Sequence, residues 1–245
     1  MPAASAPFLA LQREAARLGL ALTSAQVGLC QRYAEALIER NTHVNLTAIT
    51  APADIATKHF LDSFTALAAR RWSGRERVVD VGSGAGFPGL ALRIALPGIR
   101  LTCVESVGKK ARFIEDVCGE LGLDDVVIRA ERAETLGQER SFRGAFDVGT
   151  ARAVASLASC VEYLLPLLRA GGEAIVWKGR VDAELPPAQR ALAAVGGEIA
   201  SIVPTSSLPV AAELPGRNLV VLRKARPTPP RYPRTAQQAR ARPWR

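Results

Sequence analysis

Apolar side chains recur at helical intervals along the N-terminal part of the chain. They lie three or four residues apart, at positions 8, 11, 15 and 18 and again at 27, 30, 34 and 37. Such intervals place side chains on one face of a helix. Thr23 or Ser24 can cap the second helix, residues 41–45 predict a polar loop, and a further helical stretch is expected over 53–69. The pattern predicts a helical region over residues 1–74.

Beyond residue 75, short β-branched runs alternate with helical segments. The runs predict seven strands, over 78–81, 100–104, 126–129, 146–150, 173–177, 199–204 and 219–222. The intervening segments predict helices over 87–96, 108–121, 153–168 and 184–195. This alternation is typical of a mostly parallel sheet with helices on both faces. Because no long helix separates the last two strands, residues 75–224 are expected to form an α/β domain that ends in a hairpin.

The end of the chain has a different composition. Residues 225–245 contain five prolines, many arginines and few apolar residues, which predicts a basic, flexible tail. Residues 217–245 hold nine of the 32 Lys and Arg residues and none of the 23 Asp and Glu residues, so the remainder of the chain has equal numbers of each. This clustering favours a polyanionic partner and a merely solubilising tail about equally.

Composition excludes several classes of protein. No apolar run is long enough to cross a membrane, and residues 1–10 lack the pattern of a signal peptide, so a cytoplasmic location is expected. The four cysteines form no C-x-x-C pair and there are only two histidines, so no metal is expected. The cysteines are expected to be small buried apolar residues.

A glycine-rich turn follows the first predicted strand. Asp80 ends the strand, and glycines stand at positions 82, 84, 86 and 89. Glycine permits a tight turn into the next helix, and its missing Cβ lets a ligand approach the backbone. Two fingerprints overlap here. Gly82, Gly84 and Gly86 form the G-x-G-x-G of S-adenosylmethionine-dependent methyltransferases, whereas Gly84, Gly86 and Gly89 form the G-x-G-x-x-G of dinucleotide-binding proteins.

Two carboxylates bear on the choice between these cofactors. Glu105 ends the second strand, where it would accept hydrogen bonds from the ribose of either cofactor. Asp80 favours S-adenosylmethionine, because a carboxylate would repel a pyrophosphate and attract a cationic methionine end. A loop-capping role is the alternative for Asp80. With its seven strands and hairpin, the chain is predicted to be a class I, Rossmann-like methyltransferase; an NAD(P)-dependent oxidoreductase is the alternative.

Further motifs carry a family resemblance over nearly the whole chain. They lie at residues 45–49, 59–63, 80–89, 104–110, 152–155, 177–179 and 217–219. In these segments the chain resembles the bacterial small-subunit rRNA guanine-N7 methyltransferases, also called the glucose-inhibited division protein B family. It departs from the family pattern at Glu131, where glycine is usual, and after Arg234, where a glycine-proline turn and lysines are usual.

The resemblance implies a set of site residues. Cofactor contacts are expected at Gly82, Gly84, Gly86, Phe87, Glu105, Ala133, Glu134 and Arg152. Arg132, Lys178 and Arg217 are candidates for holding RNA, with surface ion pairs as the alternative. His59 and Asp62 are expected either to pair with one another or to contact the substrate.

The resemblance also implies the reaction and the partner. S-adenosylmethionine would methylate N7 of a guanine in 16S rRNA, guanosine 527 in this family, with the rRNA or the small ribosomal subunit as partner. A monomer is the default expectation for the oligomeric state. N7 carries a lone pair and no proton, so no general base is expected and alignment supplies the catalysis. That edge is inaccessible within A-form helices, so the target should be an exposed guanine. A non-catalytic RNA-binding module is a further alternative.

Overall fold

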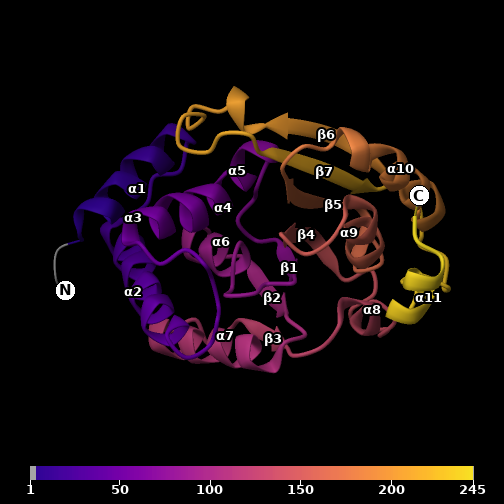
Figure 1. The fold of residues 1–245 in the computed structure, drawn as a ribbon, viewed down its shortest axis with the longest axis horizontal. Helices are drawn as coiled ribbons and strands as arrows, with labels where there is room; N and C mark the ends of the chain where they lie inside the picture. Colours follow the sequence, from indigo (N-terminus) through magenta and orange to yellow (C-terminus); the bar gives the residue numbers. More distant parts are fainter. Residues whose placement is uncertain (1–3, 245) are drawn as a thin grey trace.

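A seven-stranded sheet lies at the centre of the computed structural model, which describes residues 4–244 (Figure 1). The strand order is β3-β2-β1-β4-β5-β7-β6, and only β7 runs antiparallel to its neighbours. The bounds are β1 Arg77–Val81, β2 Arg100–Val104, β3 Val127–Arg129, β4 Phe146–Arg152, β5 Leu168–Lys178, β6 Gly197–Pro204 and β7 Asn218–Lys224. This confirms the predicted α/β class and the C-terminal hairpin.

Helices cover both faces of the sheet, because its central strands are apolar on both sides. Val78 belongs to the core beneath the N-terminal helices, and its neighbour Val79 belongs to the core on the opposite face. The first face carries α1 (Ala6–Arg17), α2 (Ser24–Asn41), α6 (Gly89–Ala95) and α7 (Gly108–Leu121). The second carries α8 (Ala133–Leu136), α9 (Leu157–Leu164) and α10 (Leu185–Val195).

The stretch predicted as one helix over 53–69 is divided. It consists of α3 (Pro52–Ile55), a π-helical turn (Ala56–Leu61), α4 (Asp62–Phe64) and α5 (Ala66–Ala69). A π-helical turn widens the helix by one residue and often marks a functional segment. Here it carries His59 and precedes Asp62. Thr23 caps α2 as expected, in a reciprocal capping box with Gln26.

The helix predicted over 153–168 is shorter than expected. Ala153 has a φ of 57°, in the left-handed region, and Ser156 caps α9 by accepting a hydrogen bond from the Ser159 backbone N–H. The chain has therefore not entered the helix before residue 157. At the other end β5 begins at Leu168, five residues before the predicted start, and its added residues include Gly171 and Gly172.

The C-terminal segment lies against the body of the protein, whereas the sequence predicts a flexible tail. Side chains of the body hold its backbone, because Arg143 donates hydrogen bonds to the carbonyls of Thr228, Pro229 and Tyr232. The short helix α11 (Ala236–Ala241) follows, beside α8 in Figure 1. Composition alone could not reveal these long-range contacts. Arg245, counted in the basic tail, lies outside the described residues.

Glu162 of α9 holds the C-terminal segment against the body of the protein. Its carboxylate accepts hydrogen bonds from the backbone and guanidinium of Arg234 and from the indole of Trp244, at 2.7–2.8 Å. Burial alone would raise the pKa of Glu162, but these bonds outweigh it and hold the pKa below the usual carboxyl value. The side chain is only 3% exposed, so the pair with Arg234 is a buried one.

We expect Glu162→Gln to lower the free energy of unfolding by about 2–4 kcal/mol, because it leaves Arg234 without its buried counter-charge. Since the folded pKa is lowered, the stabilisation by Glu162 is present above the unfolded pKa of about 4.3 and is lost as the pH falls through the lower folded value. Denaturant titration at several pH values measures both effects. Glu198→Gln is the matched control, because its pair with Arg223 is half exposed and should contribute less than about 1 kcal/mol. Equal losses in the two variants would contradict the anchoring role.

Candidate active site

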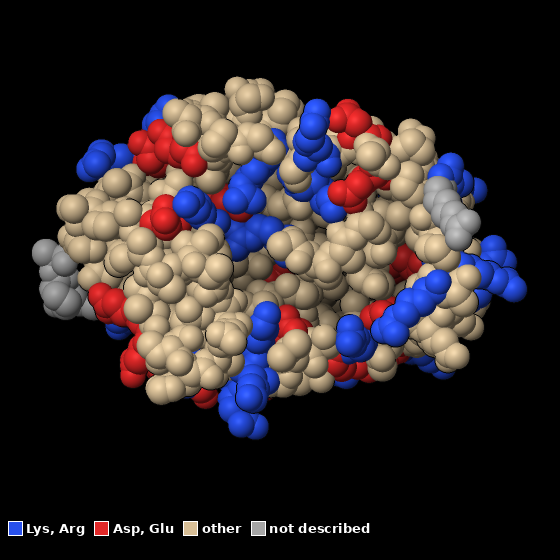
Figure 2. Space-filling view, in the orientation of Figure 1, with Lys and Arg blue, Asp and Glu red and all other residues tan. Residues whose placement is uncertain are grey.

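The cleft lies where the strand order reverses. The chain leaves β1 toward β2 on one side and leaves β4 toward β5 on the other. The carboxyl ends of β1 and β4 therefore open a crevice, the usual ligand position in such sheets. The glycine turn follows β1, β4 ends at Arg152, and residues 153 and 154 come directly after it. Figure 2 shows a hollow in the middle of this face with Lys and Arg side chains along its border.

Two adjoining cavities form this cleft. The larger, about 480 Å³, is lined by the glycine turn, the ends of β2 and β4, and residues of the N-terminal helical region. The smaller, about 120 Å³, lies between the ends of β1 and β2 and residues 131–134. Gly82, Ser106, Arg132 and Val154 line both, so the two cavities are continuous.

The structure brings most of the predicted site residues into this cleft. The larger cavity is lined by Gly82, Gly84, Phe87, Glu105, Arg132, Arg152 and Arg217. The smaller is lined by Gly82, Arg132, Ala133 and Glu134. Gly86 and Lys178 line neither. The cleft also contains Thr47, Lys58 and Lys110. The sequence singled out none of them as a site residue, although Thr47 and Lys110 lie within matched motifs.

Gly82 and Gly86 play different parts in the turn. Both have positive φ, 68° and 89°. A Cβ at Gly82 would lie 2.5 Å from Val154 Cγ2 at the cavity wall, whereas one at Gly86 would overlap the Tyr33 hydroxyl beneath the turn. Gly82 therefore keeps the cavity open, and Gly86 lets the turn pack on α2. The Cβ position of Gly86 faces the core and Gly86 lines neither cavity, so a cofactor contact there stays a prediction.

Asp80 supports the turn from within the protein. Its carboxylate is wholly buried and accepts hydrogen bonds from Thr150 Oγ1 (2.8 Å) and the Gly89 backbone N–H (3.2 Å). Burial raises its pKa to about 6 despite these bonds. Asp80 lines neither cavity, and its hydrogen bonds fit the loop-capping alternative. Its attraction for a cationic cofactor end stays a prediction.

Glu105 is a rigid acceptor at the floor of the cleft. Its two carboxylate oxygens accept backbone N–H groups of Gly84 and Val107, each at 2.8 Å. Each oxygen keeps a lone pair for a further donor, which suits a pair of ribose hydroxyls. The adjoining small cavity has the apolar residues Val81, Val104 and Ala133 in its wall, which suits a flat purine ring. These residues therefore fit the nucleoside part of S-adenosylmethionine.

Arg152 links the sheet to the helical region at the cleft. Its guanidinium donates hydrogen bonds to Asp62 Oδ2 (2.8 Å) and to His59 Nδ1 (3.3 Å). The guanidinium carbon also lies over the Phe87 ring, 5.6 Å from the ring centroid. Arg217 approaches the other oxygen of Asp62, with its Nε 3.3 Å away. His59 and Asp62 thus do not pair with one another as one alternative had it, because Arg152 lies between them.

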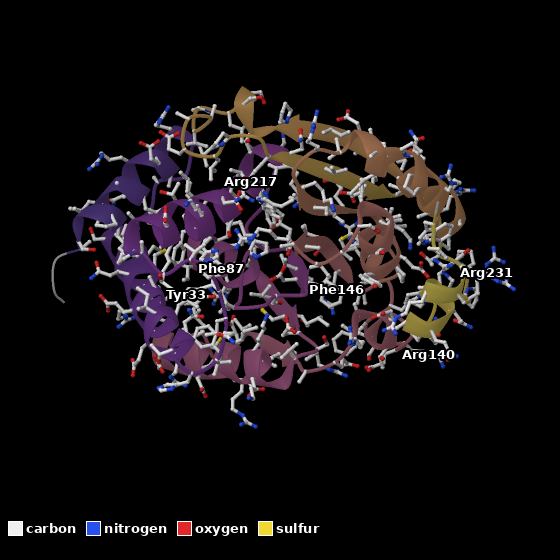
Figure 3. All side chains as sticks on the ribbon, in the orientation of Figure 1. Tyr33, Phe87, Arg140, Phe146, Arg217 and Arg231 are labelled. Carbon is white, nitrogen blue, oxygen red and sulfur yellow. The ribbon has the colours of Figure 1, made fainter. Side chains whose placement is uncertain are left out.

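His59 ends a column of aromatic rings. Its ring stacks on Phe87 (centroids 4.7 Å apart), and Phe87 stacks on Tyr33 (4.8 Å). Figure 3 shows Tyr33 and Phe87 beside one another at the centre of the molecule. Because a guanidinium only donates, Nδ1 of His59 must carry its lone pair, and Nε2–H donates to Thr47 Oγ1 at 2.9 Å. Burial, then the charges of Arg152 and Arg217, lower the pKa of His59 to about 3.

Lys178 has a structural position. Its ammonium donates to the Ala155 carbonyl (3.0 Å) and pairs with Glu184 (2.8 Å), which in turn accepts the Leu157 backbone N–H at the start of α9. Lys178 therefore fixes the segment between β4 and α9. Lys178 forms the ion pair of the alternative and lines neither cavity, and an RNA contact at Lys178 stays a prediction.

Two other features concern what the cleft holds. Within residues 4–244, no group of three or more His, Cys, Asp or Glu side chains is arranged to ligate a metal. All four cysteines are free and buried, as expected. No helix in the same part of the chain is long and apolar enough to cross a membrane.

Comparison with known proteins decides the family. The family described as rRNA small subunit methyltransferase G matches residues 26–210. The chain belongs to this family. Proteins named ribosomal RNA small subunit methyltransferase G include one from Roseiflexus castenholzii, 44% identical over 91% of this chain and 94% of its own length, and one from Deinococcus radiodurans, 45% identical over 79% and 76%. The family confirms the prediction of an rRNA methyltransferase that uses S-adenosylmethionine.

Solved structures at low identity share the fold. A SAM-dependent O-methyltransferase from Thermotoga maritima is 16% identical, with a TM-score of 0.54 over 79% of this chain and 72% of that chain. A geranyl diphosphate C-methyltransferase from Streptomyces coelicolor is 12% identical, with a TM-score of 0.55 over 83% and 99%. They confirm the class I, Rossmann-like fold.

We expect Gly82→Asp to weaken S-adenosylmethionine binding by about two orders of magnitude or more, because the new side chain would meet Val154 and fill the cavity. Calorimetry measures the affinity. Gly122→Asp is the matched control, since Gly122 also has positive φ (67°), carries no neighbour within 4 Å of a built Cβ, and ends α7. Unchanged affinity for S-adenosylmethionine in Gly82→Asp would show that the glycine turn is not part of the cofactor site.

We expect the His59 ring to remain neutral well below neutral pH. In a His43→Gln background it is the single imidazole, and its ring proton shifts should stay constant from about pH 8 to pH 5. Because the folded pKa lies below the unfolded value of about 6.5, this group's stabilisation is complete above that value and declines as the pH falls. His59→Gln should remove that decline. A titration midpoint near the unfolded value would contradict the buried, neutral ring.

Proposed function

We propose that the protein transfers a methyl group from S-adenosylmethionine to N7 of a guanine in 16S rRNA, guanosine 527 by family resemblance. One observation carries the proposal beyond family membership. Each ionisable side chain that lines the larger cavity either is a lysine or arginine or is already held by hydrogen bonds or ion pairs within the protein. Such a cleft can hold and align an anionic RNA, but it offers no free base. We also propose that it acts as a monomer in the cytoplasm.

The cofactor would lie along both cavities. Glu105 would accept the ribose hydroxyls, Ala133 and Glu134 would border the adenine, and Gly82 and Gly84 would leave room beside the turn. When bound, S-adenosylmethionine supplies an electrophilic methyl group on a sulfonium. Phe87 would contribute an apolar wall that Tyr33 and Arg152 hold in place.

The acceptor chemistry follows from the engaged side chains. Asp62 is paired with Arg152 and Arg217, and Glu105 accepts two backbone N–H groups. His59 has both ring nitrogens occupied and a pKa too low for a base near neutral pH, since burial disfavours its charged form. An amino or hydroxyl acceptor has a proton to lose, whereas guanine N7 attacks with a lone pair. The site favours the acceptor that needs no base.

Basic side chains at the rim would receive the RNA. Lys58, Lys110, Arg132 and Arg217 all line the larger cavity, from four separate segments of the chain. Phosphate contacts of this kind position RNA without reading its sequence. The guanine itself would enter the cleft from an exposed or unstacked position, because the N7 edge is otherwise hidden in A-form RNA. The 16S rRNA or the small ribosomal subunit is therefore the proposed partner.

Transfer of radiolabelled methyl to small subunits from cells lacking the modification tests the proposal. We expect label at guanine N7, detected by borohydride reduction and aniline cleavage at the modified base. The single-turnover rate should be nearly constant between about pH 6.5 and pH 8.5, because no catalytic group titrates there. Label on a ribose or exocyclic amine, or a rate that rises about tenfold per pH unit, would contradict it.

Calorimetry with NADH and S-adenosylmethionine side by side addresses the dinucleotide alternative. We expect heat of binding from S-adenosylmethionine alone. If RNA binds and no methyl group is transferred to naked 16S rRNA, to the small subunit or to an assembly intermediate, the RNA-binding module becomes the better description.

A further inference from the structure

A separate basic cavity lies at the opposite edge of the sheet. Its volume is about 270 Å³, and it is lined by residues just before β4, at the start of β5, at the end of β7 and in the segment that follows. Since β7 is antiparallel to β5, all these positions meet at the amino edge of the parallel strands. The glycine turn follows the carboxyl end of β1, so this cavity is distinct from the cleft.

Three cations and no acid line this cavity. They are Arg143, Arg169 and Lys224. Arg169 has a partner outside the cavity lining, Asp147, at 2.6 Å. In the part of the chain that the structure describes, neither Arg143 nor Lys224 forms an ion pair with a carboxylate. Lys224 is only 4% exposed. A buried cation without an anion is unusual, because burial removes the water that would solvate it.

The two unpaired cations lie close together. Arg143 Nη2 donates to the Thr228 carbonyl (2.9 Å), and Lys224 Nζ donates to the hydroxyl of the same residue. Lys224 also donates to the Leu165 carbonyl (2.6 Å). These acceptors fix the positions of both side chains but carry no net charge. Burial and then the neighbouring Arg143 lower the pKa of Lys224 to about 8, the direction expected when no counter-ion is near.

Both side chains keep donor capacity toward the cavity. An ammonium has three N–H groups and a guanidinium has five. Lys224 uses two for the contacts above, and Arg143 uses four, all to carbonyls at Gly137, Thr228, Pro229 and Tyr232. One strong donor on each residue is left over. Hydrogen bonds from charged donors to an anionic oxygen are shorter and stronger than those between neutral groups.

We propose that this cavity binds a tetrahedral oxyanion, either free inorganic phosphate or a phosphodiester of RNA, between Lys224 and Arg143. The anion would supply the missing counter-charge for both cations. Arg143 and Thr228 also hold the C-terminal segment, so the bound anion would fasten that segment to β4 and β7. The site does not depend on the proposed methyl transfer, and its test involves no methyl transfer.

Thermal unfolding in sulfate tests the site. We expect the Tm to rise with sulfate in a saturable manner at millimolar concentration, relative to chloride of equal ionic strength. General stabilisation by excluded sulfate does not saturate in this range. Lys224→Met keeps the unbranched stem and should weaken the apparent sulfate affinity by about tenfold or more, the effect of one charge-assisted hydrogen bond. Arg223→Met is the matched control, because Arg223 precedes Lys224 but is exposed and paired with Glu198.

Equal sulfate responses in Lys224→Met and wild type, or no response beyond chloride, would overturn the proposal. A second measurement needs no variant and so survives a failure of Lys224→Met to fold. The sulfate affinity of wild-type protein should fall as the pH rises through the Lys224 pKa of about 8, because the ammonium is lost while Arg143, Arg169 and Asp147 keep their charges. Constant affinity across that range would also overturn the proposal.

Filter binding of 16S rRNA separates the two sources of the anion. If RNA supplies it, Lys224→Met should weaken RNA binding and reduce the slope of log affinity against log salt by about one, whereas Arg223→Met should not. If free phosphate supplies it, Lys224→Met should lose sulfate affinity and keep RNA affinity. Either result supports the oxyanion site. If the protein shows no methyltransferase activity but retains the sulfate response, the proposed methyl transfer fails and the oxyanion site stands.

Discussion

The arrangement of the cleft depends on one buried carboxylate, Asp62. It belongs to the N-terminal helical region and has no exposed surface, yet its charge is balanced by Arg152 from the end of β4 and Arg217 from the start of β7. Trp177 of β5 donates to its backbone carbonyl at 2.9 Å. Breaking such a buried pair typically costs about 3–5 kcal/mol, because the remaining charge stays unpaired. The helical region and three strands are thus held together at the cleft itself.

The ion pair between Asp62 and Arg152 distinguishes two kinds of cation in the cleft, those held by the protein and those free to bind substrate. Arg152 is used for structure, since it holds Asp62, supports His59 and covers Phe87. Lys110 in the first turn of α7 and Arg132 just before α8 also line the cavity, and both are left for an anionic substrate. A count of basic residues cannot make this distinction, because it follows from which partner each guanidinium or ammonium reaches.

Hydrophobic periodicity and local turn chemistry predicted the strands, most helices and the glycine turn, since these depend on neighbouring residues. What the sequence could not show depends on partners far along the chain. Arg152 and Asp62 are 90 residues apart, and Arg234 and Glu162 are 72 apart. The same limit applies to Asp80, Gly86 and Lys178. Each residue type suits its predicted role, but the sequence could not show that Asp80 accepts a hydrogen bond from Thr150, that Gly86 packs against Tyr33, or that Lys178 donates to the Ala155 carbonyl. The left-handed backbone of Ala153, directly after β4, has no signal in the sequence, because alanine has no preference for that conformation.

The fold alone does not select the reaction. Among structures with a similar fold is a cyclase, with a TM-score of 0.55, so the chemistry must come from the site. Each acid facing the larger cavity is already balanced, and its single imidazole is held neutral with both nitrogens occupied. A cleft that offers no free base to the acceptor is limited to alignment and charge complementarity. Those two effects suffice for an acceptor atom that already carries a free lone pair.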